Sequence, residues 1–315
     1  MDAVSAKRYI DDAIKYFPSI RVLVITGGEC FLLGNDLIEI IQYAVNKYRL
    51  ITRIVTNAYW ATSESQTMIK LKPLVDAGLN EINFSTGDEH QKFVKFDNIV
   101  HAIKVSCQYG LSVFVSIETQ PHGKFTSKTL LDNIELNNLY KKGKFNYIDA
   151  SWMYFKNSKQ SNNYIGANSL LQQHRKPCEN ILKGIYINPY SQLLSCCGLT
   201  VEYNPFLKLG DIDKNTMIDL YQNQFNDLYK LWLLVDGPRY IYEKIMALRN
   251  ISPKFFPHDC AYCIEIVRDM NNLQILRQIL PNEIPNILYR YKILNTGVKI
   301  DFQKFGSNTH NKPIK

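Results

Sequence analysis

The sequence lacks the long hydrophobic segments that membrane proteins and exported proteins carry. No apolar run approaches the roughly 18–20 residues that a helix needs to cross a bilayer, and residues 1–20 lack the apolar core of a secretion signal. We therefore expect a cytoplasmic protein that has no membrane partner.

Several common functional signatures are also missing. The chain shows no Ser/His/Asp order, no phosphate-binding glycine loop and no dinucleotide fingerprint. Its formal net charge of +8 comes from lysines and arginines that are scattered along the chain. A scattered basic excess is typical of a solvated surface and does not form a nucleic-acid footprint. We expect no nucleic-acid partner.

Strand and helix patterns alternate through the first half of the 315 residues. A spacing of roughly 25–35 residues between strands is typical of βαβ units around a parallel sheet. The expected helices cover 5–17, a segment capped by Asn35 or Asp36, a segment that opens with a Ser63/Gln66 capping box, a segment capped by Asp97, and about 127–140. The expected strands are Ile20–Cys30 up to its glycines, Ile51–Thr56, Glu81–Ser85, Leu111–Ile117 and about 145–155.

The stretch Ile20–Cys30, IRVLVITGGEC, predicts a strand buried on both faces that ends in Gly27-Gly28-Glu29. Two glycines let the backbone approach a ligand closely. Glu29 then places a carboxylate at the carboxyl edge of the sheet, where α/β proteins hold their ligands. The same pattern also fits a tight turn with a solvated glutamate. Polar residues at the other strand ends would gather on the same rim: Thr56, Asn57, Ser85, Asp88, Ser116 and Glu118. His90, in a strand-end loop, is either a site residue or a solvated histidine.

Residues 156–177 are rich in Asn, Ser, Gln and Lys and indicate a linker. We therefore expect a first domain over 1–155, a second over 178–280 and an extension over 281–315. The second domain should contain a β-hairpin, Gly184–Asn188 with Gln192–Cys196. Helices are expected over about 216–235, 239–250 and 264–280.

Five of the seven cysteines fall in this second region, and the chain carries no export signal. That combination favours metal or redox chemistry over disulfides. The hairpin should bring Cys178 close to Cys196 or Cys197, and the CxxC motif holds Cys260 and Cys263 on one tight turn. A four-thiolate site for zinc or for an iron–sulfur cluster is predicted; buried thiols with a chance CxxC are the alternative. Cys107 should be a core residue, and Cys30 either lines a site or packs in the core.

Taken together, these motifs resemble the radical S-adenosylmethionine (radical SAM) superfamily, in particular members with a carboxyl-terminal SPASM or twitch-type domain. The resemblance covers nearly the whole chain. The motifs that carry it are ITGGEC (25–30), VTNAYWA (55–61), NFSTGDEHQKF (83–93), GLSVFVSIET (110–119) and the cysteine series that ends in CAYC (260–263).

The resemblance implies a partial (β/α)6 TIM-like barrel followed by a small cysteine-rich α+β domain. Gly27, Gly28 and Glu29 would bind the amino group of S-adenosylmethionine (SAM), and the other rim residues, from Thr56 to Glu118, would face the SAM pocket. The cysteines of the second region would hold one auxiliary [4Fe–4S] cluster. Family members commonly modify a peptide or protein side chain and take electrons from a donor such as flavodoxin or ferredoxin.

Two positions depart from the family pattern. Cys30 stands where proline usually follows GGE, and the CxxxCxxC loop that holds the SAM-binding cluster is absent. The barrel would then lack its first strand and expose an edge beside GGE, so we expect the natural protein to be longer. Two alternatives are a catalytically lapsed, metal-stabilised binding module derived from such an enzyme, and an unrelated α/β protein with a structural zinc site.

Overall fold

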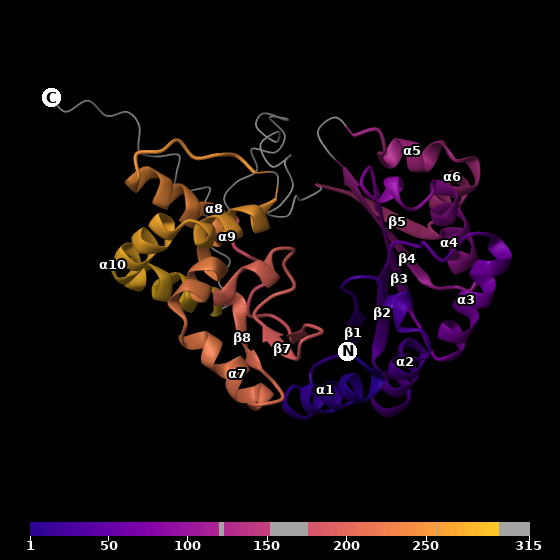
Figure 1. Ribbon diagram of the computed structural model, residues 1–315, viewed down its shortest axis with the longest axis horizontal. Coiled ribbons are helices and arrows are strands. Elements are labelled where there is room, and N and C mark those ends of the chain that lie inside the picture. The colour runs from indigo at the N-terminus through magenta and orange to yellow at the C-terminus, as the bar shows by residue number, and fades with distance from the viewer. Residues whose placement is uncertain (120–122, 152–175, 257, 296–315) are drawn as a thin grey trace. The chain divides into compact units, whose positions relative to one another are not determined.

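The computed structural model describes residues 1–119, 123–151, 176–256 and 258–295 (Figure 1). These residues form two compact units, and each is described by itself. The residues of unit 1 fall within Met1–Leu171, Ile185–Leu194 and Gly210–Leu220. Those of unit 2 fall within Gln172–Gly184, Ser195–Leu209 and Tyr221–Lys315. The expected linker lies almost entirely outside the described residues, as does the end of the strand expected over 145–155.

Unit 1 is built on a five-stranded parallel sheet with the order β1-β2-β3-β4-β5. Sequential strands lie side by side, as expected for repeated βαβ units. The strands are β1 (Val22–Ile25), β2 (Ile51–Thr56), β3 (Glu81–Gly87), β4 (Ser112–Thr119) and β5 (Phe145–Ser151). The helices are α1 (Ala3–Tyr16), α2 (Asn35–Tyr48), α3 (Glu64–Asp76), α4 (Phe96–Gln108), α5 (Ser127–Asp132) and α6 (Ile134–Lys141), with short 3₁₀ helices η1 (Cys30–Leu33) and η2 (His90–Lys92).

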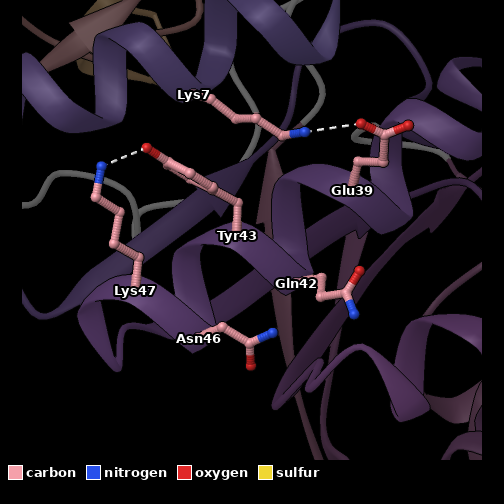
Figure 2. A pocket seen from close by; sticks show the side chains of 6 residues that line it. All are labelled: Lys7, Glu39, Gln42, Tyr43, Asn46 and Lys47. Atoms are coloured by element: carbon pink, nitrogen blue, oxygen red, sulfur yellow. Dashed lines mark hydrogen bonds and ion pairs between the residues drawn. The ribbon is translucent and has the colours of Figure 1, made fainter.

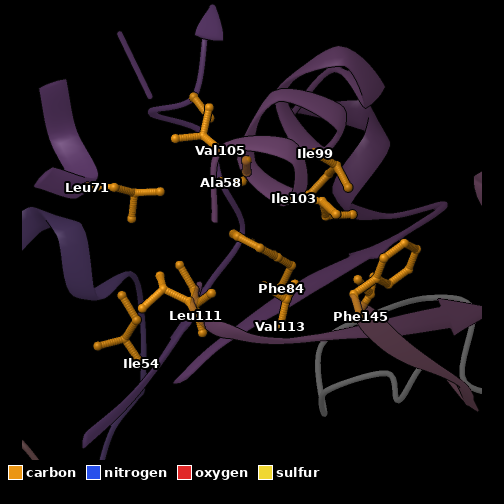
Figure 3. Close-up of a cluster of buried hydrophobic side chains, with 14 of the residues drawn as sticks. Ile54, Ala58, Leu71, Phe84, Ile99, Ile103, Val105, Leu111, Val113 and Phe145 are labelled. Carbon is orange, nitrogen blue, oxygen red and sulfur yellow. The ribbon is translucent and has the colours of Figure 1, made fainter. Parts of the chain in front are cut away.

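One face of the sheet carries the hydrophobic core. Alternate residues of the central strands are buried against helices that lie on the same side of the sheet (Figure 1). Figure 3 shows Ile54 and Phe84 of two neighbouring strands meeting Leu71 of α3 and Ile103 of α4. The residues between them, which point to the opposite face, are partly exposed. The sheet therefore has one packed face and one accessible face.

The expectation that the first strand is covered on both faces is wrong. Among the described residues β1 is an edge strand that pairs with β2 alone, and Val22 and Val24 are each more than 40% exposed. The continuous apolar run predicted a strand with both faces buried. In the structure, the more buried and the more exposed side chains alternate along β1, as they do in the neighbouring strands. Only Leu23 and Ile25 contact the core.

Several predicted caps also differ. α2 is capped by Gly34 and not by Asn35 or Asp36, and α4 is capped by Lys95 and not by Asp97. Asp36 and Asp97 instead lie in the first turns, where a carboxylate still favours the helix dipole. Ser63 does cap α3 and accepts a hydrogen bond from the Gln66 amide. The single helix expected over 127–140 is divided at Asn133, which caps α6.

The second half of the chain contains the expected hairpin, but its residues fall within unit 1 and not in a second domain as predicted. β6 (Tyr186–Ile187) pairs antiparallel with β7 (Gln192–Leu194), and β8 (Lys208–Asp211), which the sequence did not predict, completes a sheet with the order β6-β7-β8. The helices are α7 (Met217–Asn223), α8 (Leu228–Leu248), α9 (Asp259–Arg268) and α10 (Met270–Asn295), and short 3₁₀ helices cover Val201–Tyr203, Pro205–Leu207 and Gln224–Asn226. No helix among the described residues is long and apolar enough to span a membrane.

Candidate functional site

The carboxylate of Glu29 lies at the carboxyl ends of β1 and β2 and is held by four donors, of which the Cys30 thiol is the most distant (Sγ to Oε1, 3.8 Å). Its Oε1 accepts hydrogen bonds from the Thr56 hydroxyl (2.7 Å) and the Phe31 amide (3.1 Å), and its Oε2 accepts one from the Asn57 amide (2.9 Å). This network fixes Glu29 in place, and Oε2, which accepts only the Asn57 amide among the described residues, keeps capacity for a further donor. The structure thus brings together three of the residues predicted for the rim.

Further hydrogen bonds hold the Thr56 side chain in place. Its hydroxyl accepts a hydrogen bond from the Trp60 indole N–H (2.9 Å) while it donates to Glu29, so its orientation is determined. Trp60 stacks on Phe31, with ring centroids 3.9 Å apart. Ala58 lies between Thr56 and Trp60 in the chain and is fully buried. Its φ is +61°, a conformation that costs energy in a residue other than glycine. The turn after β2 is therefore shaped to present Thr56 and Asn57 to Glu29.

The glycines before Glu29 leave open space at this edge. Gly27 and Gly28 both have positive φ angles, +89° and +56°, and both are exposed. A Cβ added at either position would meet nothing within 4 Å. Glycine is needed there for its backbone conformation, and a ligand can approach the main chain beside the Glu29 carboxylate.

The remaining rim residues lie on β3 and β4. Ser85 and Ser116 are paired across the two strands and both are partly exposed on the accessible face. Asp88 serves the local fold: its Oδ1 accepts hydrogen bonds from the amides of Lys124 (2.8 Å) and Phe125 (3.0 Å). Its Oδ2 is buried without a hydrogen-bond partner among the described residues.

His90 and Glu118 face each other at the end of β4. Nδ1 of His90 lies 4.0 Å from Oε2 of Glu118, and both side chains are about three-quarters buried. Burial lowers the pKa of His90 and raises the pKa of Glu118, so each group is shifted toward its neutral form. Gly87 lets the end of β3 lie close to the Glu118 main chain, because a Cβ there would clash with the Glu118 carbonyl oxygen.

The thiol cluster of unit 2 consists of Cys178, Cys196, Cys260 and Cys263. Cys260 and Cys263 lie on the first turns of α9 and not on a tight turn as predicted. A Cβ placed on Gly198 would lie 3.1 Å from the Cys260 sulfur and 3.3 Å from the Cys196 sulfur, so these two sulfurs flank the same glycine. Cys196 is buried whereas Cys197 is exposed.

The four thiols share raised pKa values, and burial is the main cause for each of them. Burial raises the pKa of Cys196 to about 12 and that of Cys260 to about 11, and Cys178 contributes to both shifts. Burial also raises the pKa of Cys263, with contributions from the other three thiols. Among the residues that the structure describes, no group of three or more Cys, His, Asp or Glu side chains is arranged to hold a metal ion. The donor set is all sulfur, which suits zinc or an iron–sulfur cluster, but the sulfurs do not form a preassembled ion site.

Hydrogen bonds distinguish these thiols from the two cysteines of unit 1. Cys30 and Cys107 direct their sulfurs at backbone carbonyls, those of Val55 (3.3 Å) and Lys144 (3.5 Å), which suits a neutral S–H donor. In unit 2 the sulfurs instead accept: the Gly198 amide donates to Cys196 and the Asn204 side-chain amide donates to Cys263, both at 3.4 Å. Cys30 is fully buried in the core and Cys107 is partly buried.

Two backbone features fix the positions of the cysteines. The imidazole Nδ1 of His258 caps α9 by accepting a hydrogen bond from the Cys260 amide (3.1 Å). The Cys178 amide donates to the Leu233 carbonyl (2.9 Å), in the turn of α8 that precedes the break at Gly237. The Gly237-Pro238 dipeptide was the sequence signal for this break, but Asn204 and Gly198 carried no recognisable signal.

A pocket of about 400 Å³ lies elsewhere in unit 1, on the outer surface of α1 and α2 (Figure 2). Its lysines are engaged, since Lys7 pairs with Glu39 and Lys47 donates to the Tyr43 hydroxyl, each at 2.7 Å. Because these polar groups satisfy one another and lie away from the strand ends, the rim and the thiol cluster remain the candidate sites.

A comparison of the chain with protein-family models found no match. A comparison with curated proteins found none either.

Proposed function

We propose that the chain is the body of a radical SAM protein, in which unit 1 is a partial barrel that binds SAM and unit 2 carries an auxiliary [4Fe–4S] cluster. The observation that carries the proposal is the Glu29 carboxylate, fixed by Thr56 and Asn57 beside two exposed glycines. We place the SAM ammonium group on Glu29, where it would donate a charge-assisted hydrogen bond to Oε2, the carboxylate oxygen that accepts only the Asn57 amide among the described residues.

The accessible face of the sheet supports the rest of the SAM site. Ser85 and Ser116 are partly exposed there and offer hydroxyl groups, and we assign them to the ligand together with Asp88 and Glu118. Gly27 and Gly28 have no side chains and open space beside them, so the ligand can reach their main chain. These residues bind and orient the ligand.

The cysteines of unit 2 suit an iron–sulfur cluster chemically, because all four side chains offer sulfur, Cys196 and Cys263 are buried, and the sulfurs of these two accept N–H hydrogen bonds. Cys178, Cys196, Cys260 and Cys263 would be the ligands, and the exposed Cys197 would not be needed. A bound [4Fe–4S] cluster supplies one-electron redox chemistry. The protein contributes the buried surroundings and the hydrogen bonds to the sulfurs.

By the same resemblance we propose a cytoplasmic protein that acts on a peptide or protein side chain and receives electrons from a flavodoxin or ferredoxin. The lapsed binding module is the second candidate. The two candidates differ in the CxxxCxxC motif, which would hold the SAM-binding cluster of the enzyme.

Metal analysis tests unit 2. We expect protein purified without oxygen to contain iron and acid-labile sulfide, with a brown colour that Cys260→Ser and Cys263→Ser abolish. Cys107→Ser, in unit 1, is the control and should keep the iron. Zinc without sulfide would instead support the structural zinc site.

Ligand binding tests unit 1. Glu29→Gln removes the charge that pairs with the ammonium group, and loss of one hydrogen bond to a charged group is worth about tenfold to a hundredfold in affinity. Equilibrium dialysis with labelled SAM measures the change. Glu39→Gln, an exposed position on α2, is the matched control and should bind as the unchanged protein does. Equal affinity of the two variants would contradict the role of Glu29.

The coding sequence upstream of Met1 separates the enzyme from the binding module. An in-frame CxxxCxxC would favour the enzyme, and the protein expressed with it should cleave SAM to 5′-deoxyadenosine. An in-frame stop codon would favour the binding module.

A further inference from the structure

A buried tyrosine of α1 contacts two turns that come from the second half of the chain. Tyr9 is 3% exposed, and its hydroxyl lies within hydrogen-bond distance of the Ser191 hydroxyl (2.7 Å) and of Oδ1 of Asp213 (2.8 Å). The guanidinium of Arg8 pairs with the same Asp213 carboxylate and donates to the Tyr9 hydroxyl (3.1 Å). These four residues, which we call the Tyr9 cluster, all belong to unit 1.

The two turns lie at the same end of a pair of neighbouring strands. Ser191 directly precedes β7, and Asp213 follows the end of β8 by two residues. At this end the Ile212 amide donates to the Ser191 carbonyl (2.9 Å), and at the other end the Ser195 amide donates to the Leu207 carbonyl (2.8 Å). The β7–β8 pair is therefore joined at both ends, and the Tyr9 cluster holds the first of them.

The other end of the β7–β8 pair leads directly to the thiol cluster. Cys196 comes two residues after β7 ends at Leu194, and the division between the two units crosses both strands at this point. β6 and β7 are paired at two positions. A hairpin of this length is at best marginally stable by itself in water, so its order depends on contacts with other parts of the chain. The Tyr9 cluster provides such contacts at the turn of the hairpin.

We propose that Tyr9 is a positioning residue for Cys196. Its hydroxyl fixes one end of the β7–β8 pair, and the pair fixes the backbone that carries Cys196 at the other end. The inference rests on the proposed metal site of unit 2, but not on which metal occupies that site. It adds that a helix of unit 1 contributes to the affinity of the site.

Thiol reactivity tests the positioning in the metal-free protein. Tyr9→Phe removes the hydroxyl but keeps the buried ring, so α1 should stay packed. Cys196 is 6% exposed and reacts when the end of β7 opens. A hydrogen bond to a charged group is worth about tenfold or more in such an equilibrium, so a maleimide should label Cys196 about tenfold faster in the variant. Cys263, 8% exposed on α9, is the internal reference and should keep its rate.

Tyr43→Phe is the matched control. The Tyr43 hydroxyl donates to Asp11 of α1 at 2.6 Å, so this variant also removes a tyrosine–carboxylate hydrogen bond of α1, but one that involves neither β7 nor β8. It should leave the ratio of Cys196 to Cys263 labelling unchanged. Asp213→Ala removes the acceptor of the Tyr9 hydroxyl instead of the hydroxyl itself, and it should reproduce the effect of Tyr9→Phe.

Zinc titration of the full chain against a competing chelator tests the site itself. Opening of β7 competes with metal binding, so Tyr9→Phe should bind zinc about tenfold more weakly and Tyr43→Phe as tightly as the unchanged protein. An unchanged labelling ratio or an unchanged zinc affinity in Tyr9→Phe would overturn the inference. If the unchanged protein bound neither zinc nor an iron–sulfur cluster, the proposed metal site would fail, and the labelling ratio alone would decide whether Tyr9 positions Cys196.

Discussion

The break in α8 gives a sharp prediction for Gly237→Ala. Gly237 has φ 79° and ψ 164°, a conformation open almost only to glycine. A Cβ there would lie 1.7 Å from the Lys176 carbonyl oxygen and 2.9 Å from its carbon. These are backbone atoms, so the contact is relieved only if the segment that leads into Cys178 moves away from α8.

Two contributions determine how much stability Gly237→Ala should cost. A non-glycine residue in this conformation costs about 1–3 kcal/mol. Displacement of the segment also removes the hydrogen bond from the Cys178 amide to the Leu233 carbonyl, 2.9 Å long, which contributes about 0.5–1.5 kcal/mol. We expect unit 2 to lose about 2–4 kcal/mol of stability on these grounds.

Hydrogen exchange of peptides from α8 and α9 measures the opening free energy of unit 2 alone. Gly143→Ala is the control, since Gly143 also has a positive φ (+67°) but a Cβ there meets nothing within 4 Å. That variant should cost about 1–2 kcal/mol in unit 1 and leave unit 2 unchanged. If Gly237→Ala left exchange in α8 and α9 and the metal content of the protein unchanged, the reasoning about the helix break would be refuted.

Two further predictions concern unit 1. Phe84→Ala should lower the free energy of unfolding by about 3–5 kcal/mol, because the ring is fully buried in the core, whereas Phe93→Ala, at 88% exposure, should change the urea midpoint little. Burial lowers the pKa of His90 below 6.5, so below that pH the unfolded chain takes up a proton that the folded one resists, and stability falls as the pH drops. Between about pH 7 and pH 5 the His90→Asn variant should therefore lose less free energy of unfolding than the unchanged protein. An equal loss in the two proteins would count against this effect. Glu118 has a raised pKa, so it stabilises the folded state as the pH falls, and it does so in both proteins.

The sequence predicted the parallel α/β arrangement well because periodicity is a local property. β2 has the predicted bounds, and Ser63 caps α3 as predicted. β1 shows the limit of this prediction. An apolar run indicates a strand but does not indicate how many strands lie beside it. Its position at the edge depends on the rest of the sheet, which no local pattern encodes.

The candidate site was predicted in part for the same reason. The alignment of parallel strands places Glu29, Thr56 and Asn57 at one edge, so their contact could be anticipated from strand ends. The groups around the thiols could not, since Asn204 reaches Cys263 from a position between two short 3₁₀ helices. Such contacts arise from tertiary packing between segments whose sequences show no periodicity or motif.

The exposed edge strand has a consequence for the behaviour of the protein in solution. One edge of β1 presents backbone N–H and C=O groups with no neighbouring strand among the described residues, and the VLVI side chains include two valines open to solvent. Strands of this kind recruit strands from other molecules and start aggregation. Natural sequences protect such edges with lysine, proline or a bulge, and β1 has none of these. Colloidal stability at high protein concentration should therefore depend on this strand, and lysine in place of Val24 should improve it.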